Sequence, residues 1–85
     1  MTLFRVIVEP RAEKELRRLP KHELPRMAEA LRSLAFDPYV GKKLRGEWDG
    51  HRSLRVWPYR IIYVLDHAVV TITVLAVGHR KNVYR

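Results

Sequence analysis

Apolar residues at alternate positions open the chain. Over residues 3–9, Phe4, Val6 and Val8 alternate with Arg5 and Ile7. A period of two places successive side chains on opposite faces, as in a β-strand. The first element is therefore predicted to be a strand.

The apolar spacing then changes to three or four residues, which predicts two helices. The first should begin at Pro10 and end before Pro20, because proline is tolerated in a first turn and stops a helix elsewhere. The second, more amphipathic helix should cover residues 24–35 and end before Asp37-Pro38. Their apolar stripes are Ala12, Leu16 and Leu19, and Leu24, Met27, Ala28, Leu31, Leu34 and Ala35. We interpret the second stripe as core.

Both periodicities fail over residues 39–50, where three glycines indicate a loop. This loop carries the basic side chains Lys42, Lys43 and Arg45. Strands are then predicted at 52–57, 59–65 and 69–77, separated by tight turns at Trp57-Pro58 and Asp66-His67.

This order of elements predicts a single α+β domain over residues 1–85. An initial strand and a two-helix hairpin precede a three-strand meander, and we expect one antiparallel sheet with the helices on one face. The face toward the helices should present Leu54, Val56, Tyr59, Ile61, Tyr63, Leu65, Val70, Ile72 and Val74. The other face should present His51, Ser53, Arg55 and Arg60, approached by His79, Arg80 and Tyr84 beyond Gly78.

Two arginines should lie side by side on that second face. If Trp57-Pro58 is a two-residue turn, Val56 lies opposite Tyr59 and Arg55 opposite Arg60. Like charges opposite one another weaken a sheet, so the pair is either held in solvent or used to receive an anion. We favour the anion.

Composition supports an anionic partner. Seventeen Lys and Arg against nine Asp and Glu give a net charge of +8. Nucleic acid is the commonest partner of such a surface, an anionic membrane is a weaker option, and a role of the charge in solubility alone is the remaining alternative. The sequence has no cysteine, no cluster with metal-ligand spacing and no apolar run long enough to cross a bilayer. We expect a cytoplasmic protein without metal or cofactor.

Several motifs occur in a recognisable order. After the strand come a helix ended by Leu-Pro, a helix ended by Asp-Pro, K-L-R-G, then R-x-L-R-V-x-x-Y-R-I-I-Y and V-G-H-R-x-x-V-Y-R. This order, which covers nearly the whole chain, resembles the RelE/ParE superfamily of toxins of type II toxin–antitoxin pairs. The closing motif is more similar to the RelE branch, whose members cleave mRNA in the ribosomal A site, than to the ParE branch, which poisons DNA gyrase.

The resemblance implies particular site residues. The RelE active-site arginines match Arg60 and Arg80, and its near-terminal tyrosine matches Tyr84. Two lysines that some members carry fall on His51 and Ser53, so a lysine base cannot be transferred to this chain. A glycine common in the turn of relatives is Trp57 here.

These residues suit metal-independent RNA cleavage by the 2′-OH. The arginines would stabilise the phosphorane, and Tyr84 would transfer a proton, with His79 and His51 as rivals. The expected catalytic residues are Arg60, Arg80, Tyr84 and His79. The expected RNA-binding residues are Lys43, Arg45, His51, Arg52, Ser53 and Arg55. Trp48 and Trp57 are either stacking platforms for RNA or packing residues.

The leading functional hypothesis is a ribosome-dependent mRNA endoribonuclease that inhibits translation. A gyrase-poisoning toxin and a non-catalytic RNA-binding module are the alternatives. The resemblance further implies a hetero-oligomer with a cognate antitoxin, which we expect to be acidic, partly disordered and helical once bound.

Overall fold

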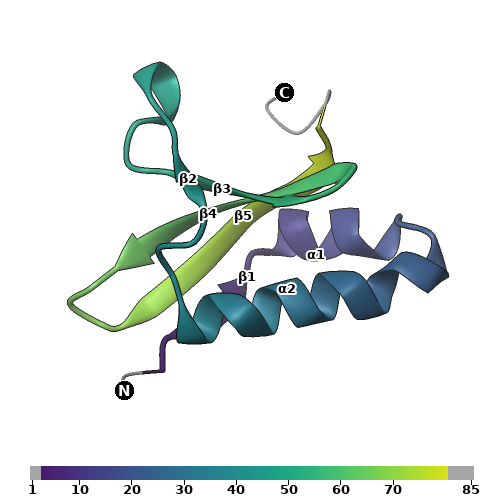
Figure 1. Cartoon of the computed structure of the whole chain (residues 1–85), viewed down its shortest axis with the longest axis horizontal. Coiled ribbons are helices and arrows are strands. Elements are labelled where there is room, and N and C mark those ends of the chain that lie inside the picture. The colour runs from purple at the N-terminus through teal and green to yellow at the C-terminus, as the bar shows by residue number, and fades with distance from the viewer. Residues whose placement is uncertain (1–2, 81–85) are drawn as a thin grey trace.

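The structure, a computed structural model, describes residues 3–80. Its elements in chain order are β1 (Arg5–Val8), α1 (Pro10–Arg17), η1 (Lys21–Glu23), α2 (Leu24–Phe36), β2 (Lys42–Lys43), η2 (Gly46–Trp48), β3 (Arg52–Val56), β4 (Tyr59–Asp66) and β5 (Thr71–His79). The strands form one sheet in the order β1-β5-β4-β3-β2. Both α-helices cover the same face of this sheet (Figure 1). The predicted α+β class with helices on one face is confirmed.

The two helices bury narrow apolar stripes and leave their charged sides in solvent. Ala12 of α1 and Met27 and Leu34 of α2 are buried, whereas Leu24 and Ala28, assigned to the stripe from sequence, are exposed. Ion pairs three or four residues apart follow the exposed sides, joining Arg11 to Glu15, Arg17 to Glu13, Arg26 to Glu23 and Arg32 to Glu29. Within residues 3–80 no helix has the length and apolar character needed to span a membrane.

The core lies between the helices and the sheet. Its buried members are Ala12, Met27, Leu34, Ile61, Tyr63, Ile72, Val74 and Val77, and Phe4, Val6, Val8, Leu54, Val56, Tyr59 and Leu65 pack against them. Each fully buried Leu or Ile side chain stabilises the fold by about 1.5–3 kcal/mol relative to exposure. The alternation of the strands therefore assigned the core face correctly at nearly every position.

The prediction of an antiparallel sheet is wrong for one pair of strands. β1 pairs with β5 in parallel, with Val6 opposite Ile72. The prediction assumed that the helices return the chain to the end of β1. However, α2 has 13 residues and α1 has 8, so α2 reaches back to the beginning of β1, where the Phe4 N–H donates to the Ala35 carbonyl at 2.9 Å. The chain then enters β3 in the direction of β1.

The two turns of the meander differ from one another. Trp57-Pro58 is a two-residue turn with Val56 opposite Tyr59, as predicted. The β4–β5 connection is longer than the predicted two residues, since Asp66 pairs with Thr71 across residues 67–70. Val70 lies in this turn with φ of 49°, so it is not on the core face of a strand.

A β-bulge in β5 changes which residues face the helices. Tyr63 pairs with Val74, whereas Ile62 pairs with Ala76, so Leu75 has no partner of its own on β4. The extra residue reverses the alternation, because successive strand side chains point to opposite faces. Beyond the bulge Val77 enters the helix-side core, and Ala76 packs on the opposite face.

The segment predicted as a loop contains two short elements, the strand β2 at the edge of the sheet and the helix η2 after it. Lys42 and Lys43 pair with Ser53 and Arg52 and form the edge strand β2. After β2, Leu44 and Trp48 pack against Ile62 and Ala76 in a second small apolar cluster. Trp48 is therefore a packing residue, which was one of the two alternatives for it.

Tyr63 fastens the start of this segment to the core. Its buried hydroxyl donates to the Pro38 carbonyl at 2.8 Å and accepts from the Gly41 N–H at 2.9 Å. Burial raises the pKa of this hydroxyl, against smaller opposing effects of the Gly41 hydrogen bond and the Arg52 charge. The hydroxyl therefore remains a protonated donor at neutral pH.

Tyr63→Phe is expected to lower the free energy of unfolding by about 2 kcal/mol, because it leaves two buried backbone groups unpaired. Urea denaturation at pH 7 measures this change. A phenol in the unfolded chain ionises near about pH 10, below the raised pKa of the folded state. Parent stability should therefore fall as pH rises above about 10 more steeply than that of the variant. Equal pH dependence would contradict the assignment.

Candidate functional site

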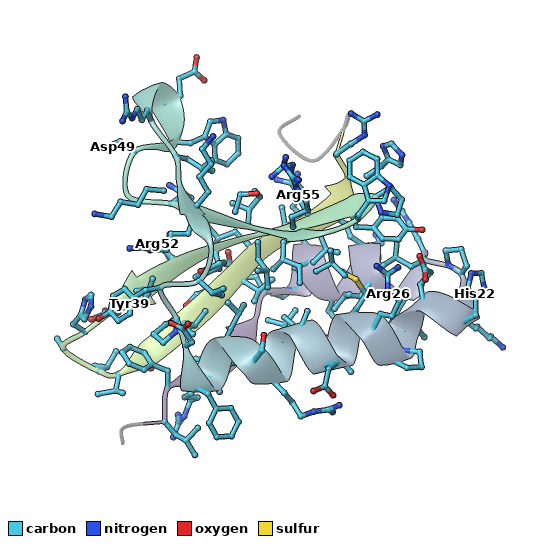
Figure 2. All side chains as sticks on the ribbon, in the orientation of Figure 1. His22, Arg26, Tyr39, Asp49, Arg52 and Arg55 are labelled. Carbon is cyan, nitrogen blue, oxygen red and sulfur yellow. The ribbon has the colours of Figure 1, made fainter. Side chains whose placement is uncertain are left out.

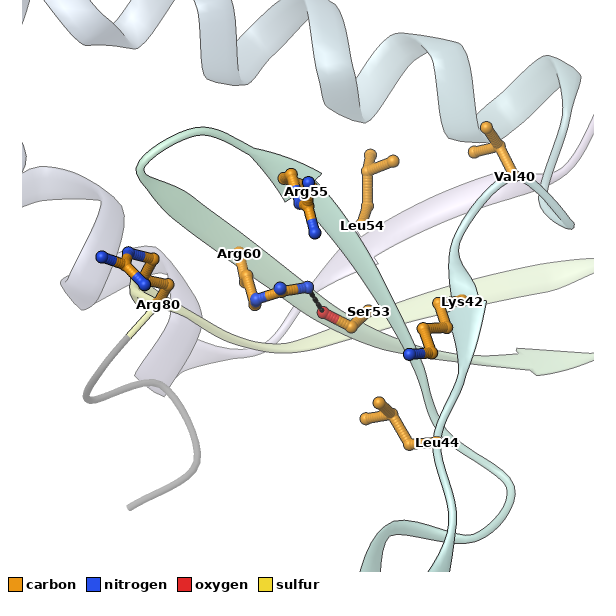
Figure 3. A pocket seen from close by; sticks show the side chains of 8 residues that line it. All are labelled: Val40, Lys42, Leu44, Ser53, Leu54, Arg55, Arg60 and Arg80. Atoms are coloured by element: carbon orange, nitrogen blue, oxygen red, sulfur yellow. Dashed lines mark hydrogen bonds between the residues drawn. The ribbon is translucent and has the colours of Figure 1, made fainter.

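A basic hollow lies on the face of the sheet opposite the helices. It encloses about 510 Å³ and is lined by Val40, Lys42, Leu44, Ser53, Leu54, Arg55, Arg60 and Arg80 (Figure 3). Four of these eight side chains are cationic and none is acidic. We call it the Arg60 pocket.

Arg60 is held at the centre of this pocket by its strand partners. Arg55 of β3 is directly opposite Arg60 of β4, as predicted from the turn. The Arg60 Nη1 donates to the hydroxyl of Ser53 at 3.3 Å, and Ser53 is only 2 % exposed (Figure 3). One side of the half-buried guanidinium is thus anchored to the sheet, and its other N–H groups, which bond to no side chain within residues 3–80, can donate to an anion.

Arg80 reaches the same pocket from the end of β5. Its backbone N–H donates to the Pro58 carbonyl at 2.9 Å, which fixes it beside the β3–β4 turn. Its guanidinium carbon lies 4.6 Å from the centre of the Trp57 ring. In Figure 3 the side chain is turned away from Arg60 and Ser53, at one end of the pocket.

Lys42 lines the pocket and was not among the site residues expected from sequence. Its position opposite Ser53 places it on the same face as Arg55 and Arg60. A strand of two residues is too short to be recognised from an alternation of apolar and polar residues. The only available signal was the basic character of the loop, which pointed equally to Lys43 and Arg45.

The other expected RNA-binding residues lie elsewhere. Lys43, His51 and Arg52 line a separate hollow of about 400 Å³. There Arg52 donates to the carbonyls of Tyr39 and Gly41 at 3.2 and 2.8 Å, and it lies beside Tyr39 and apart from Arg55 in Figure 2. Arg45 lines a further hollow along β2. Of the six expected residues, only Ser53 and Arg55 line the Arg60 pocket.

The expectation that His79 joins the basic surface is wrong. His79 pairs with Tyr59, and their rings meet edge to face with centroids 6.4 Å apart. Because of the bulge, this position belongs to the helix side of the sheet. His51 packs edge to face on Trp48 at 5.4 Å, outside the pocket. Tyr84, expected to transfer a proton, lies outside the described residues.

The electrostatics of the pocket favour a phosphate. All four ion pairs within residues 3–80 lie in the helical half of the chain, so none of them neutralises a cation of the pocket. Clustered guanidinium groups bind phosphate oxygens with charge-assisted, often bidentate hydrogen bonds. In this described part of the chain, no three His, Asp or Glu side chains are grouped so that they could hold a metal ion.

Comparisons with known proteins agree with this geometry. The family model of the ParE toxin of the type II toxin–antitoxin system parDE matches residues 6–84. Toxin RelG of Mycobacterium tuberculosis is 38% identical over 76 residues, which cover 87% of this chain and 87% of RelG.

Two solved structures are also similar. A chain of the M. tuberculosis toxin–antitoxin complex RelBE2 superposes with a TM-score of 0.88 and 33% identity, covering 96% of this chain and 97% of that one. A chain of the archaeal RelE-RelB complex from Pyrococcus horikoshii OT3 gives 0.78 and 28%, covering 96% and 99%. With the matched family model, these relatives show that the chain belongs to the ParE toxin family and is a type II toxin of the RelE/ParE superfamily.

Proposed function

We propose that this toxin is an endoribonuclease that cuts mRNA at the ribosome without a metal ion. The observation that supports this most directly is the Arg60 pocket, where Arg60 is anchored on buried Ser53 beside Arg55. A fixed guanidinium among other cations is suited to a phosphate whose negative charge increases during a reaction. The relation to RelG, a named toxin, adds support.

In the proposed reaction the 2′-oxygen of one nucleotide attacks the adjacent phosphorus. The O2′–P bond forms and the P–O5′ bond breaks, which leaves a 2′,3′-cyclic phosphate and a 5′-hydroxyl. A base must accept the 2′-OH proton, and an acid must protonate the leaving O5′. Arg60 and Arg55 would stabilise the charge on the phosphorane. Tyr84 remains the predicted proton-transfer residue, and the helix-side position of His79 argues against that role for it.

The partner is proposed to be a cognate antitoxin. RelBE2 and the archaeal RelE-RelB assembly are toxin–antitoxin complexes. A chain with net charge +8 would attract an acidic, partly disordered antitoxin segment that becomes helical as it binds. Association kinetics across a salt series test this, because electrostatic attraction lowers the on-rate as ionic strength rises.

Induced expression followed by primer extension across cellular mRNAs tests the enzymatic activity. The proposal expects new 5′ ends at discrete positions within translated regions, appearing before growth stops. In a reporter mRNA expressed in the same cells, these 5′ ends should be absent when the ribosome-binding site of the reporter is removed. Growth arrest with intact mRNA would contradict the proposal.

Poisoning of DNA gyrase is the second candidate, because the matched family model is that of the ParE toxin. This function predicts that cleaved gyrase–DNA complexes accumulate without any added gyrase inhibitor, while mRNA stays intact. Purified gyrase with supercoiled plasmid, incubated with the toxin, distinguishes the two functions in one assay.

The RNA-binding contribution of Lys42 can be predicted separately. Lys42→Ala should weaken binding of a single-stranded RNA several-fold. The negative slope of log K against log salt should become shallower by about 0.7, as expected for one lost phosphate contact. Lys14→Ala, which removes an exposed lysine from α1, is the control and should change neither quantity. Filter binding at several salt concentrations measures both. An unchanged slope for Lys42→Ala would place RNA away from β2.

A further inference from the structure

Trp57 contacts one of the cations of the Arg60 pocket. The guanidinium carbon of Arg80 lies 4.6 Å from the centre of the indole ring, which is cation–π geometry. We propose that Trp57 is a positioning residue that holds the Arg80 guanidinium at the turn end of the pocket so that it can receive an RNA phosphate. This inference rests on the proposed nuclease function.

The turn that carries the ring is itself held from two sides. Trp57 and Pro58 form the β3–β4 turn, and the Trp57 carbonyl accepts from Arg26 Nη2 of α2 at 2.8 Å. Arg26 in turn contacts both carboxylate oxygens of Glu23, at 3.0 and 3.1 Å. The Pro58 carbonyl meanwhile accepts the Arg80 N–H. The indole and the backbone of Arg80 are therefore fixed to the same two-residue turn.

Stacking suits this task because it leaves the donors of the guanidinium unused. The five N–H groups of arginine point outward in the plane of the group, whereas an aromatic ring covers its face. A carboxylate partner would instead occupy those donors and cancel the charge. Arg80 on Trp57 loses rotamer freedom before RNA arrives and keeps both its charge and its hydrogen-bonding edge.

A simple structural role does not explain the exposed indole. Trp57 is 54% exposed, although large aromatic side chains usually bury most of their area. Its other possible function is to stack directly on an RNA base. The two functions differ in one measurable respect, because only positioning makes the effect of Trp57 depend on Arg80.

The test compares cleavage of ribosome-bound mRNA by the parent and by Trp57→Phe, Trp57→Leu, Arg80→Ala and the Arg80→Ala/Trp57→Leu double variant. Trp57→Leu should lower kcat/KM about two- to fivefold, the range for an exposed cation–π pair, and Trp57→Phe should restore most of the loss. In the Arg80→Ala background, Trp57→Leu should have no further effect. An equal loss with and without Arg80 would assign Trp57 to direct RNA contact and overturn the proposal. An unchanged kcat/KM for Trp57→Leu would also overturn the proposal.

A second measurement needs no catalysis. Subtracting the fluorescence of a Trp57→Leu variant from that of the same protein with Trp57 leaves the emission of Trp57 without that of Trp48. Acrylamide should quench this component more strongly after Arg80→Ala, because one face of the indole is uncovered, and Arg80→Lys should give an intermediate result. Equal quenching in all three backgrounds would mean that Arg80 does not rest on Trp57. If the parent cuts no RNA, the proposed function fails, and quenching alone decides whether Trp57 holds Arg80.

Discussion

Arg60→Ala is expected to reduce mRNA cleavage by about 10²–10³ while the protein remains folded. This is the usual loss when one preorganised donor to a developing oxyanion is removed. Arg60 is central to the pocket, opposite Arg55 and hydrogen-bonded to Ser53, so no neighbouring side chain duplicates its geometry. Single-turnover cleavage of a ribosome-bound message measures the effect, and growth arrest on induction should disappear with it.

Two control variants separate charge from shape at this position. Arg60→Lys keeps the charge but loses the planar pair of donors, so it should recover only part of the rate. Arg18→Ala removes an exposed arginine after α1 and should cleave at the parental rate. If a folded Arg60→Ala protein cuts mRNA as fast as the parent, the Arg60 pocket is not the active site.

Gly41→Ala is expected to destabilise the fold by about 3 kcal/mol. A Cβ at this position would lie 2.4 Å from the Tyr63 hydroxyl oxygen and 2.8 Å from its ring. Tyr63 is fully buried and cannot move aside without breaking its bonds to Pro38 and Gly41. Overpacking and loss of these hydrogen bonds both contribute. The midpoint of urea denaturation should fall accordingly.

A double-variant cycle tests the cause of that loss. In a Tyr63→Phe background the nearest atom is absent, so Gly41→Ala should cost less than it does in the parent. Additive losses would show that the damage does not come from the hydroxyl. Because Lys42 follows Gly41 directly, RNA binding by folded Gly41→Ala protein should also weaken.

The parts of the fold that local patterns determine could be predicted from the sequence. Pro58 confines the turn to two residues, and alternation then places Arg55 beside Arg60 without any tertiary information. The α2 stripe is likewise local, since it depends only on the helical period. The pairing of Arg55 with Arg60 in the candidate site followed from the two-residue turn and the alternation of side chains.

The remaining features depend on distances that no local pattern contains. The direction of β1 relative to β5 depends on how far α2 extends past α1. Lys42 joins the pocket because Tyr63, 22 residues away, anchors Gly41. Trp57 was recognised as unusual in the turn, but its contact with Arg80 required the path of β5.

The unpaired Leu75 has a consequence for sequence change in this strand. This extra residue shifts the alternation of side chains by one position. Which basic side chain faces the pocket therefore depends on the number of residues that follow the bulge. When the bulge is kept, deleting one residue between Leu75 and Gly78 would exchange the orientations of His79 and Arg80, giving the pocket an imidazole and the helix side an arginine. The β4–β5 turn has no such constraint, because lengthening it leaves the pairs beyond it in phase. Natural variation in length should therefore be tolerated at residues 67–70 and be rare between the bulge and Arg80.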